Sequence, residues 1–256
     1  PQFWPAVLDY IGKKVVVIGS GATAVTLVPS LTEAGSPGCG AAHVTMLQRT
    51  PTWYFIRPAK DAMANRLRRI MPESWAYALT RFKNVRLQNF AFKMARRNPQ
   101  KVADNLLGKI RDHLGPQMNE ADFTPPYNPW EQRLCLVPDG DFFNALKDGT
   151  ASIVTDHIER FTPTGIQLAS GRHLDADIIV TATGLKLAVA GKARFMVDGQ
   201  PIDWHRHFYY KGCMFSNVPN LSVVFGYLNL PRAQSHDSDR HRHRGADAVA
   251  CGREGR

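Results

Sequence analysis

The sequence predicts an α/β fold built on a parallel sheet, and features of its first fifty residues carry this prediction. An unbroken apolar run over residues 13–19 has the pattern of a parallel strand buried on both faces. A helix is expected over residues 22–31, bent or shortened at Pro29, and a second strand over residues 43–48. Strand, tight turn, helix and strand within about 35 residues form a βαβ unit.

The turn after the first strand fits the pattern G-x-G-x-x-A and predicts a Rossmann-like dinucleotide site. Gly19 permits the tight turn, Gly21 lets the backbone approach a pyrophosphate, and the small Ala24 lets helix and strand pack closely. The free N–H groups at the start of the helix face the anion. The full run is Gly19, Ser20, Gly21, Ala22, Thr23 and Ala24. A purely structural glycine turn is the alternative, but the preceding strand and following helix supply the context that the motif requires.

The end of the second strand predicts NADP rather than NAD as the dinucleotide. An NAD site has Asp or Glu here to hold the ribose 2′-hydroxyl, yet no acid occurs within residues 43–56. Arg49 and Thr50 follow the strand instead, and a guanidinium with a hydroxyl suits the 2′-phosphate of NADP. An ordinary surface arginine is the alternative interpretation of Arg49.

Residues 57–115 are expected to be helical, with Pro72 and Pro99 as breakers, and to form an insertion within the α/β domain. Between residues 57 and 112 there are 14 Lys and Arg against 4 acids, which accounts for the whole net charge of +10. Apolar residues recur at helical spacing, among them Ala76, Leu79 and Phe82. The basic face of such amphipathic helices is either simply solvated or a docking surface for anionic lipid or an acidic partner.

Further strands are expected over residues 151–155, 158–161, 166–168 and 178–181. By contrast, the last 26 residues, from Pro231 onward, lack aromatic residues and apolar periodicity, which predicts disorder. Three histidines there, His236, His241 and His243, form a metal-binding candidate, but a solvated tail is the favoured interpretation. The abrupt change in composition suggests a shifted reading frame, which resequencing the locus would test.

No run of 18 apolar residues occurs, so a soluble and cytoplasmic protein is expected. The four cysteines are scattered without C-x-x-C spacing, so neither a metal site nor a redox pair is predicted. Trp53, Tyr54 and Phe55 are expected in a flexible aromatic loop that gives no sharp substrate preference.

Several segments resemble class B flavoprotein monooxygenases of the Baeyer–Villiger type. The opening Pro1-Gln2-Phe3-Trp4-Pro5 is similar to the end of their F-x-G-x-x-x-H-x-x-x-W-P pattern. Residues 177–184 (DIIVTATG) resemble the segment that returns the chain from the NADPH domain to the FAD domain, with Thr183 and Gly184 as cofactor contacts. Residues 131–141 resemble the segment with the catalytic arginine, which falls at Arg133, and Gln132 stands where many members have Lys. Residues 225–229 (FGYLN) are similar to a late segment near the flavin.

This resemblance implies a monooxygenase that uses NADPH and FAD to insert one oxygen atom from O2 into ketones or onto sulfur. A ketone or thio-compound and O2 would be its partners, and no nucleic acid is implied. It also implies an NADPH-binding domain over residues 1–185 with a helical insertion at about 57–130. Residues 186–230 would be a remnant of the FAD domain, whose pyrophosphate-binding glycine motif is not in this sequence. There are two alternatives: an inactive truncated product that at most binds NADP(H), and a basic interaction module at residues 57–112.

Overall fold

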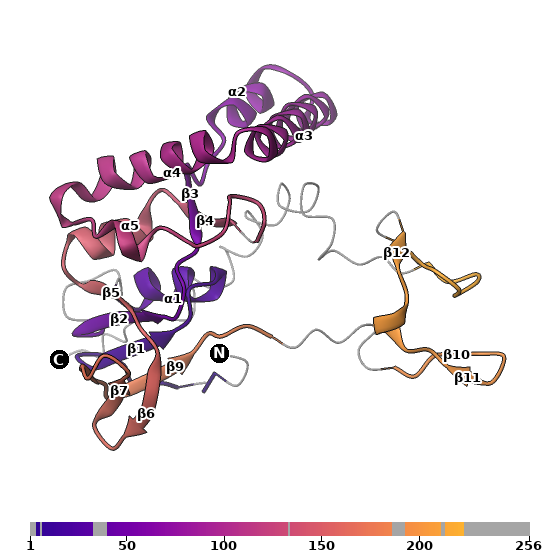
Figure 1. Cartoon of the computed structure of the whole chain (residues 1–256). Helices are drawn as coiled ribbons and strands as arrows, with labels where there is room; N and C mark the ends of the chain where they lie inside the picture. Colours follow the sequence, from indigo (N-terminus) through magenta and orange to yellow (C-terminus); the bar gives the residue numbers. More distant parts are fainter. Residues whose placement is uncertain are drawn as a thin grey trace, which may run out of the picture.

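The computed structural model of the chain describes residues 4–5, 7–32, 40–132, 134–185, 193–210 and 213–222. Its main sheet has four strands in the order β5-β2-β1-β9 (Figure 1). The strands are β1 (Lys14–Ile18), β2 (His43–Gln48), β5 (Ala151–Thr155) and β9 (Ile178–Thr181). All three neighbouring pairs are parallel, and this is the strand order of a doubly wound sheet. The predicted α/β fold is therefore confirmed.

The apolar run predicted as the first strand forms β1, which is buried on both faces. Val15 and Val17 belong to the larger core together with helix α1 (Ala22–Thr32). Val16 faces the opposite side, because successive side chains of a strand alternate, and belongs to a second core with Ile166 and Leu168. That core lies under an antiparallel sheet of β6 (Ile158–Thr162), β7 (Gly165–Leu168) and β8 (His173–Asp175).

Helix α1 spans Ala22–Thr32, which confirms the helix expected over residues 22–31, and it runs through Pro29 without being shortened there. Proline removes one helical hydrogen bond, which is unfavourable in a helix interior. Here Val28, Pro29 and Leu31 are all buried. Tertiary packing of this face therefore outweighs the local preference of proline.

The residues expected in a flexible aromatic loop instead form β3 (Trp53–Arg57), which pairs in parallel with β4 (Leu134–Pro138). Trp53 is 3% exposed and Tyr54 is 1% exposed, so the loop prediction is wrong. The Tyr54 ring packs against three phenylalanines, Phe123, Phe142 and Phe143, the last two from α5 (Asp141–Lys147). Burial of this aromatic cluster fixes the strand.

Three helices lie between β3 and β4, which confirms the helical prediction for this stretch: α2 (Ala62–Ile70), α3 (Glu73–Arg97) and α4 (Pro99–Leu114). Pro72 immediately precedes α3 and Pro99 is the first residue of α4, where proline costs a helix little. Helix α4 is followed by two short 3-10 helices, η1 (Gly115–Gln117) and η2 (Glu120–Asp122). In Figure 1, α4 and α5 lie nearer the sheet, and α2 and α3 form the end of the helical layer farthest from it.

Residues 193–210 and 213–222 contain short elements that lie apart from the main sheet in Figure 1. They are β10 (Met196–Val197), β11 (Gln200–Pro201), η4 (Trp204–Arg206), β12 (Tyr209–Tyr210) and β13 (Met214–Phe215). The segment at residues 225–229 and the tail with His236, His241 and His243 lie outside the described residues. Within the described ranges, no helix combines the length and the apolar character needed to span a bilayer.

Candidate functional site

Three connecting segments meet at the carboxyl edge of the main sheet. They follow β1, β2 and β9, and backbone hydrogen bonds continue the sheet pairing into them. The Gly19 amide donates to the Leu47 carbonyl at 2.8 Å, and the Ala182 amide donates to the Ile18 carbonyl at 2.8 Å. Ligands of doubly wound sheets bind at this edge, at the point where the strand order reverses beside the first strand.

Gly19 is the residue at which this edge is most tightly packed. Its φ is 129°, a conformation that residues with a side chain rarely adopt. A Cβ at this position would lie 2.5 Å from the carbonyl oxygen of Ala182, in the segment after β9. The first glycine of the motif is therefore needed both for its conformation and for contact between two strand ends.

Gly21, the second glycine of the motif, has open space where a side chain would be. A Cβ built there meets no heavy atom within 4 Å. Ala22 and Thr23 begin α1 and are exposed, whereas Ala24 is completely buried against the sheet. This combination leaves the first turn of α1 open to an anion, because the leading N–H groups of a helix have no partner within it.

The segment after β2 is tied to this turn by a side-chain hydrogen bond. The Ser20 hydroxyl donates to the Thr50 carbonyl oxygen at 3.0 Å. Thr50 is half-buried, and Arg49 is exposed with no hydrogen-bond or ion-pair partner among the described residues. The structure thus brings Arg49 and Thr50 to the same edge as the glycine turn, with the guanidinium free to meet an anion.

Two residues at this edge were missed by sequence reasoning. Gln48, the last residue of β2, is completely buried, and its Nε2 donates to the Asp122 carbonyl (2.8 Å) and the Thr155 hydroxyl (2.9 Å). Its Oε1 is buried without a partner among the described residues. The second residue is Asp122, an acidic residue that lies near β2 although it is distant from it in the sequence. Thr155 donates to its Oδ1 at 2.5 Å and Asn119 to its Oδ2 at 2.8 Å, so both oxygens are engaged within the fold.

The remaining predicted site residues belong to two segments of the chain, one after β9 and one before β4. Thr183 and Gly184 follow β9, and both are exposed. Gln132 is exposed too, whereas Arg133 lies outside the described residues. Two positions further on, the buried Cys135 thiol lies 3.7 Å from the Ser20 carbonyl oxygen, which brings β4 against the glycine turn.

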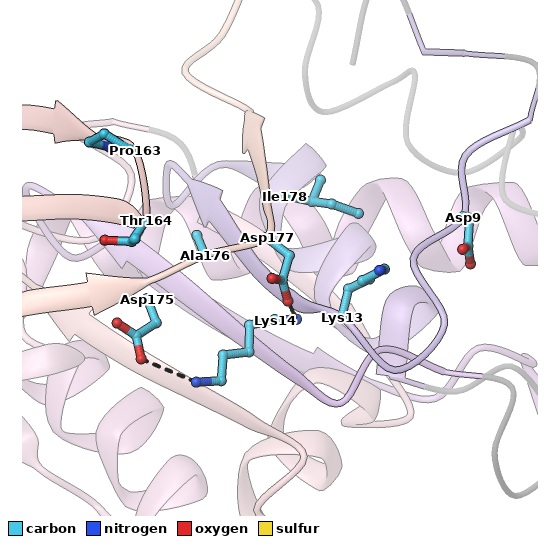
Figure 2. A pocket seen from close by; sticks show the side chains of 9 residues that line it. All are labelled: Asp9, Lys13, Lys14, Pro163, Thr164, Asp175, Ala176, Asp177 and Ile178. Atoms are coloured by element: carbon cyan, nitrogen blue, oxygen red, sulfur yellow. Dashed lines mark hydrogen bonds and ion pairs between the residues drawn. The ribbon is translucent and has the colours of Figure 1, made fainter.

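A hollow lies at the opposite edge of the sheet, where β1 and β9 begin. Its volume is about 720 Å³. Figure 2 shows the side chains that line it, around the first residues of β1 and β9. Lys14 and Asp175 line it and form an ion pair at 3.1 Å, and Asp177 accepts a hydrogen bond from the Lys14 amide at 2.8 Å. None of the predicted site residues lines this hollow. The candidate site is the carboxyl edge, because the open glycine turn, the first turn of α1 and the exposed Arg49 come together there.

No protein-family model matches the chain. It is, however, 49% identical over 229 residues to "Probable FAD-binding monooxygenase AlmA" of Acinetobacter baylyi. It is also 49% identical over 230 residues to the FAD-containing monooxygenase EthA of Mycobacterium tuberculosis. Each match covers 90% of this chain, and the chain spans 45% of AlmA and 46% of EthA. This similarity confirms the resemblance drawn from the sequence.

Solved structures share the fold at low sequence identity. The crystal structure of OTEMO in an FAD-bound form has a TM-score of 0.52 and 21% identity, covering 73% of this chain and 41% of that one. OTEMO in complex with FAD and NADP gives a TM-score of 0.51 at 21% identity, covering 72% of this chain and 40% of that one. These likenesses support the Rossmann-type fold.

Proposed function

Because the chain is homologous over 90% of its length to FAD-containing monooxygenases, we propose that it is the NADPH-binding part of such an enzyme. The reaction proposed is of the Baeyer–Villiger type, in which one oxygen atom from O2 enters a ketone or is added to sulfur. The observation that carries the proposal is the carboxyl edge of the sheet, where an open glycine turn adjoins an exposed arginine.

Each part of the dinucleotide has a matching part of this edge. The open space at Gly21 and the first turn of α1 suit the pyrophosphate, since backbone N–H groups and the helix dipole favour an anion there. Arg49 and Thr50 suit the 2′-phosphate of NADPH. Ser20 fixes the Thr50 backbone through its hydrogen bond, and Thr183 and Gly184, which follow Ala182 after β9, would contact the cofactor. When bound, NADPH supplies hydride and FAD supplies the activation of O2.

The domain organisation and the catalytic arginine belong to the same proposal. Residues 1–185 would form the NADPH-binding domain with a helical insertion at about 57–130, and residues 186–230 would belong to the FAD domain. Arg133 would lend a permanent positive charge to the oxygenation step, and Gln132 would lie beside the cofactor phosphates. The proximity of Cys135 to the glycine turn supports a role for this segment at the cofactor.

A second candidate is a chain that binds NADP(H) without turnover. The chain spans about half the length of the curated relatives it matches, so the flavin chemistry depends on what accompanies it. Both candidates share the dinucleotide site, and they differ in whether a flavin is held.

One experiment tests the dinucleotide site and separates these candidates. The full chain is expressed with excess FAD and desalted. Its absorbance at about 450 nm then reports retained flavin, and titrations with NADPH and NADH report nucleotide binding. Saturable binding of NADPH in preference to NADH is expected, and a Gly21→Ala variant should bind neither well. Retained flavin supports the monooxygenase, and NADPH binding without flavin supports the second candidate. Equal failure to bind either nucleotide would contradict both.

We also propose that the basic helices within residues 57–112 contact a membrane surface. Their positive charge and the exposed apolar residues of α3, such as Trp75 at 69%, support this. Cytoplasmic localisation stays a prediction from the sequence.

A further inference from the structure

Helix α3 has an unusual surface for a long helix of a folded protein. Of its 25 residues, only Ala76 and Ala95 are buried, whereas an amphipathic helix normally buries a continuous apolar stripe. Its large apolar side chains are exposed instead: Trp75, Tyr77, Leu79, Phe82, Leu87, Phe90, Phe92 and Met94. Such a concentration of exposed aromatic and aliphatic surface marks an interaction site.

Part of this surface forms a straight line along the helix. Seven exposed positions, separated by intervals of three or four residues, define what we call the outward stripe: Trp75, Leu79, Phe82, Arg86, Phe90, Lys93 and Arg97. Residues at these intervals lie on one side of an α-helix. The first three positions of the stripe are apolar, and three of the last four are basic, with Phe90 between Arg86 and Lys93. The Arg86 guanidinium lies 5.2 Å from the centre of the Phe82 ring, so charge and aromatic surface are presented together.

The charge of the hairpin formed by α2 and α3 is strongly one-sided. Residues 62–97 contain nine Lys and Arg and a single acid, Glu73. Within the described ranges, only Lys83 of these nine is in an ion pair, with Asp61. The other cations are therefore available for an anionic partner, and their effects add because they are distributed along one helix pair.

Aromatic and basic residues mixed on one exposed helix side suit the interface of a lipid bilayer. Tryptophan and phenylalanine enter the boundary between headgroups and acyl chains, and long basic side chains reach back to the anionic headgroups. Helices α2 and α3 lie at the end of the helical layer farthest from the main sheet (Figure 1).

We propose that the outward stripe of α3 lies flat in the interface of an anionic phospholipid bilayer, with Trp75, Phe82 and Phe90 inserted below the headgroups. This inference rests on the membrane contact proposed for residues 57–112 and assigns the contact to one helix side. It adds apolar insertion to what would otherwise be a purely electrostatic contact. The partner is fixed by charge complementarity, because a net positive hairpin meets a net negative surface.

The test uses the full chain and vesicles of phosphatidylcholine with or without phosphatidylglycerol. Binding is measured by flotation of the vesicles. The wild type is expected to bind the anionic vesicles with an affinity at least about tenfold higher than its affinity for phosphatidylcholine alone. A triple variant, Trp75→Ser with Phe82→Ser and Phe90→Ser, should bind anionic vesicles at least about tenfold more weakly. These side chains are 69%, 62% and 61% exposed, so the fold should be unaffected. The matched control is Phe161→Ser, because Phe161 is 59% exposed on β6 and distant from α3 in sequence.

Each outcome has a definite meaning. Weakened vesicle binding by the triple variant, with unchanged NADPH titration, supports the inference. Equal vesicle binding by wild type and triple variant overturns apolar insertion and leaves an electrostatic contact only. Absence of wild-type binding to any vesicle overturns both the inference and the membrane contact. Capture by soluble polyglutamate without vesicle binding would also overturn it, in favour of an acidic protein partner.

Tryptophan fluorescence gives a second readout that does not depend on removing the stripe. Lipids brominated on the acyl chain should quench the wild-type emission. The Trp75→Phe variant should still bind the vesicles but lose this part of the quenching. Vesicle-bound wild type with unquenched emission would overturn insertion at Trp75.

Discussion

The Ser20 hydroxyl donates a hydrogen bond to the Thr50 carbonyl oxygen at 3.0 Å, across thirty positions of sequence. This bond joins the glycine turn after β1 to the segment after β2. The same two segments are also linked by the hydrogen bond from the Gly19 amide to the Leu47 carbonyl. The part of the edge assigned to the pyrophosphate and the part assigned to the 2′-phosphate therefore hold each other in place.

Substitution of Ser20 by alanine should weaken NADPH binding more than NADH binding. Loss of one neutral hydrogen bond costs about 0.5–1.5 kcal/mol, which corresponds to roughly two- to tenfold in affinity. The loss of affinity should be greater for NADPH, because only NADPH has the 2′-phosphate that Arg49 and Thr50 are proposed to bind. Isothermal titration with both nucleotides measures the ratio. Ser30→Ala is the control, because Ser30 makes a similar bond to the Thr26 carbonyl inside α1. Equal weakening of both nucleotides by Ser20→Ala would contradict this role.

Substitution of Arg49 by alanine should abolish the preference for NADPH over NADH. A hydrogen bond to a charged group contributes about 1.5–3 kcal/mol, so NADPH affinity should fall roughly ten- to a hundredfold. NADH has no 2′-phosphate, and its binding should hardly change. Arg172, an exposed arginine in the turn before β8, supplies the control variant Arg172→Ala. Arg49 would be an ordinary surface arginine if its variant kept the wild-type preference.

Substitution of Gly19 by alanine should destabilise the whole domain. The new Cβ would lie 2.5 Å from the Ala182 carbonyl, and the φ of 129° is unfavourable for alanine. We expect the free energy of unfolding to fall by more than about 1 kcal/mol, measured by urea denaturation.

Gly21→Ala is the matched control for that experiment. Its Cβ would meet no heavy atom within 4 Å, so the stability should be nearly unchanged. NADPH binding should nevertheless weaken, because the methyl group would occupy space that the pyrophosphate needs. Similar instability of the two variants would show that packing at Gly19 is not the cause.

Local patterns predicted the parts of this fold that depend on local structure. Adjacent residues alone were enough to predict β1, the G-x-G-x-x-A turn and β2. Strand β3 did not, because Trp53-Tyr54-Phe55-Ile56 is apolar throughout without alternation. Its identity as a strand depends on β4, about eighty positions away in the sequence.

The candidate site shows the same division between local and distant information. Gly19, Gly21 and Arg49 were predicted because each follows a strand with a recognisable pattern. Contact between Gln48 and Asp122 could not be predicted, since seventy-four positions separate them. The spacing of Leu79 and Phe82 predicted a helix correctly, but helical spacing alone does not determine whether that side is covered.

Arg133 provides the prediction that concerns the oxygenation chemistry. In a chain completed with an FAD-binding portion, Arg133→Ala should still oxidise NADPH but should lose oxygenated product, because a stabilising positive charge is removed. Product from a ketone or thioether is measured by chromatography alongside NADPH consumption. Arg172→Ala, at an exposed arginine in the turn before β8, is the control and should retain product formation. Normal product yield from Arg133→Ala would contradict the assignment.

The stability of the α2–α3 hairpin should depend on pH through Asp61. Burial raises the pKa of Asp61, but the hydrogen bonds from Lys83 and the Ala64 amide outweigh it, so the pKa is lowered overall. Lys83 donates to one carboxylate oxygen at 2.6 Å, and the Ala64 amide donates to the other at 3.0 Å as the N-cap of α2. A lowered folded-state pKa means that the unfolded chain binds the proton first. The stabilisation is therefore complete above the unfolded pKa of about 3.9 and is lost as the pH falls through the folded pKa.

Asp61→Asn measures this contribution directly. Asparagine can still cap α2, but it cannot form the ion pair with Lys83. Near pH 7 the variant should be less stable by up to about 1 kcal/mol, because partly exposed ion pairs contribute little. This difference should shrink as the pH is lowered from about 5 to about 2, since the wild-type carboxylate then becomes neutral as well. Urea denaturation of both proteins across this range gives the comparison. A difference that stays constant with pH would mean that the Asp61 charge does not stabilise the hairpin.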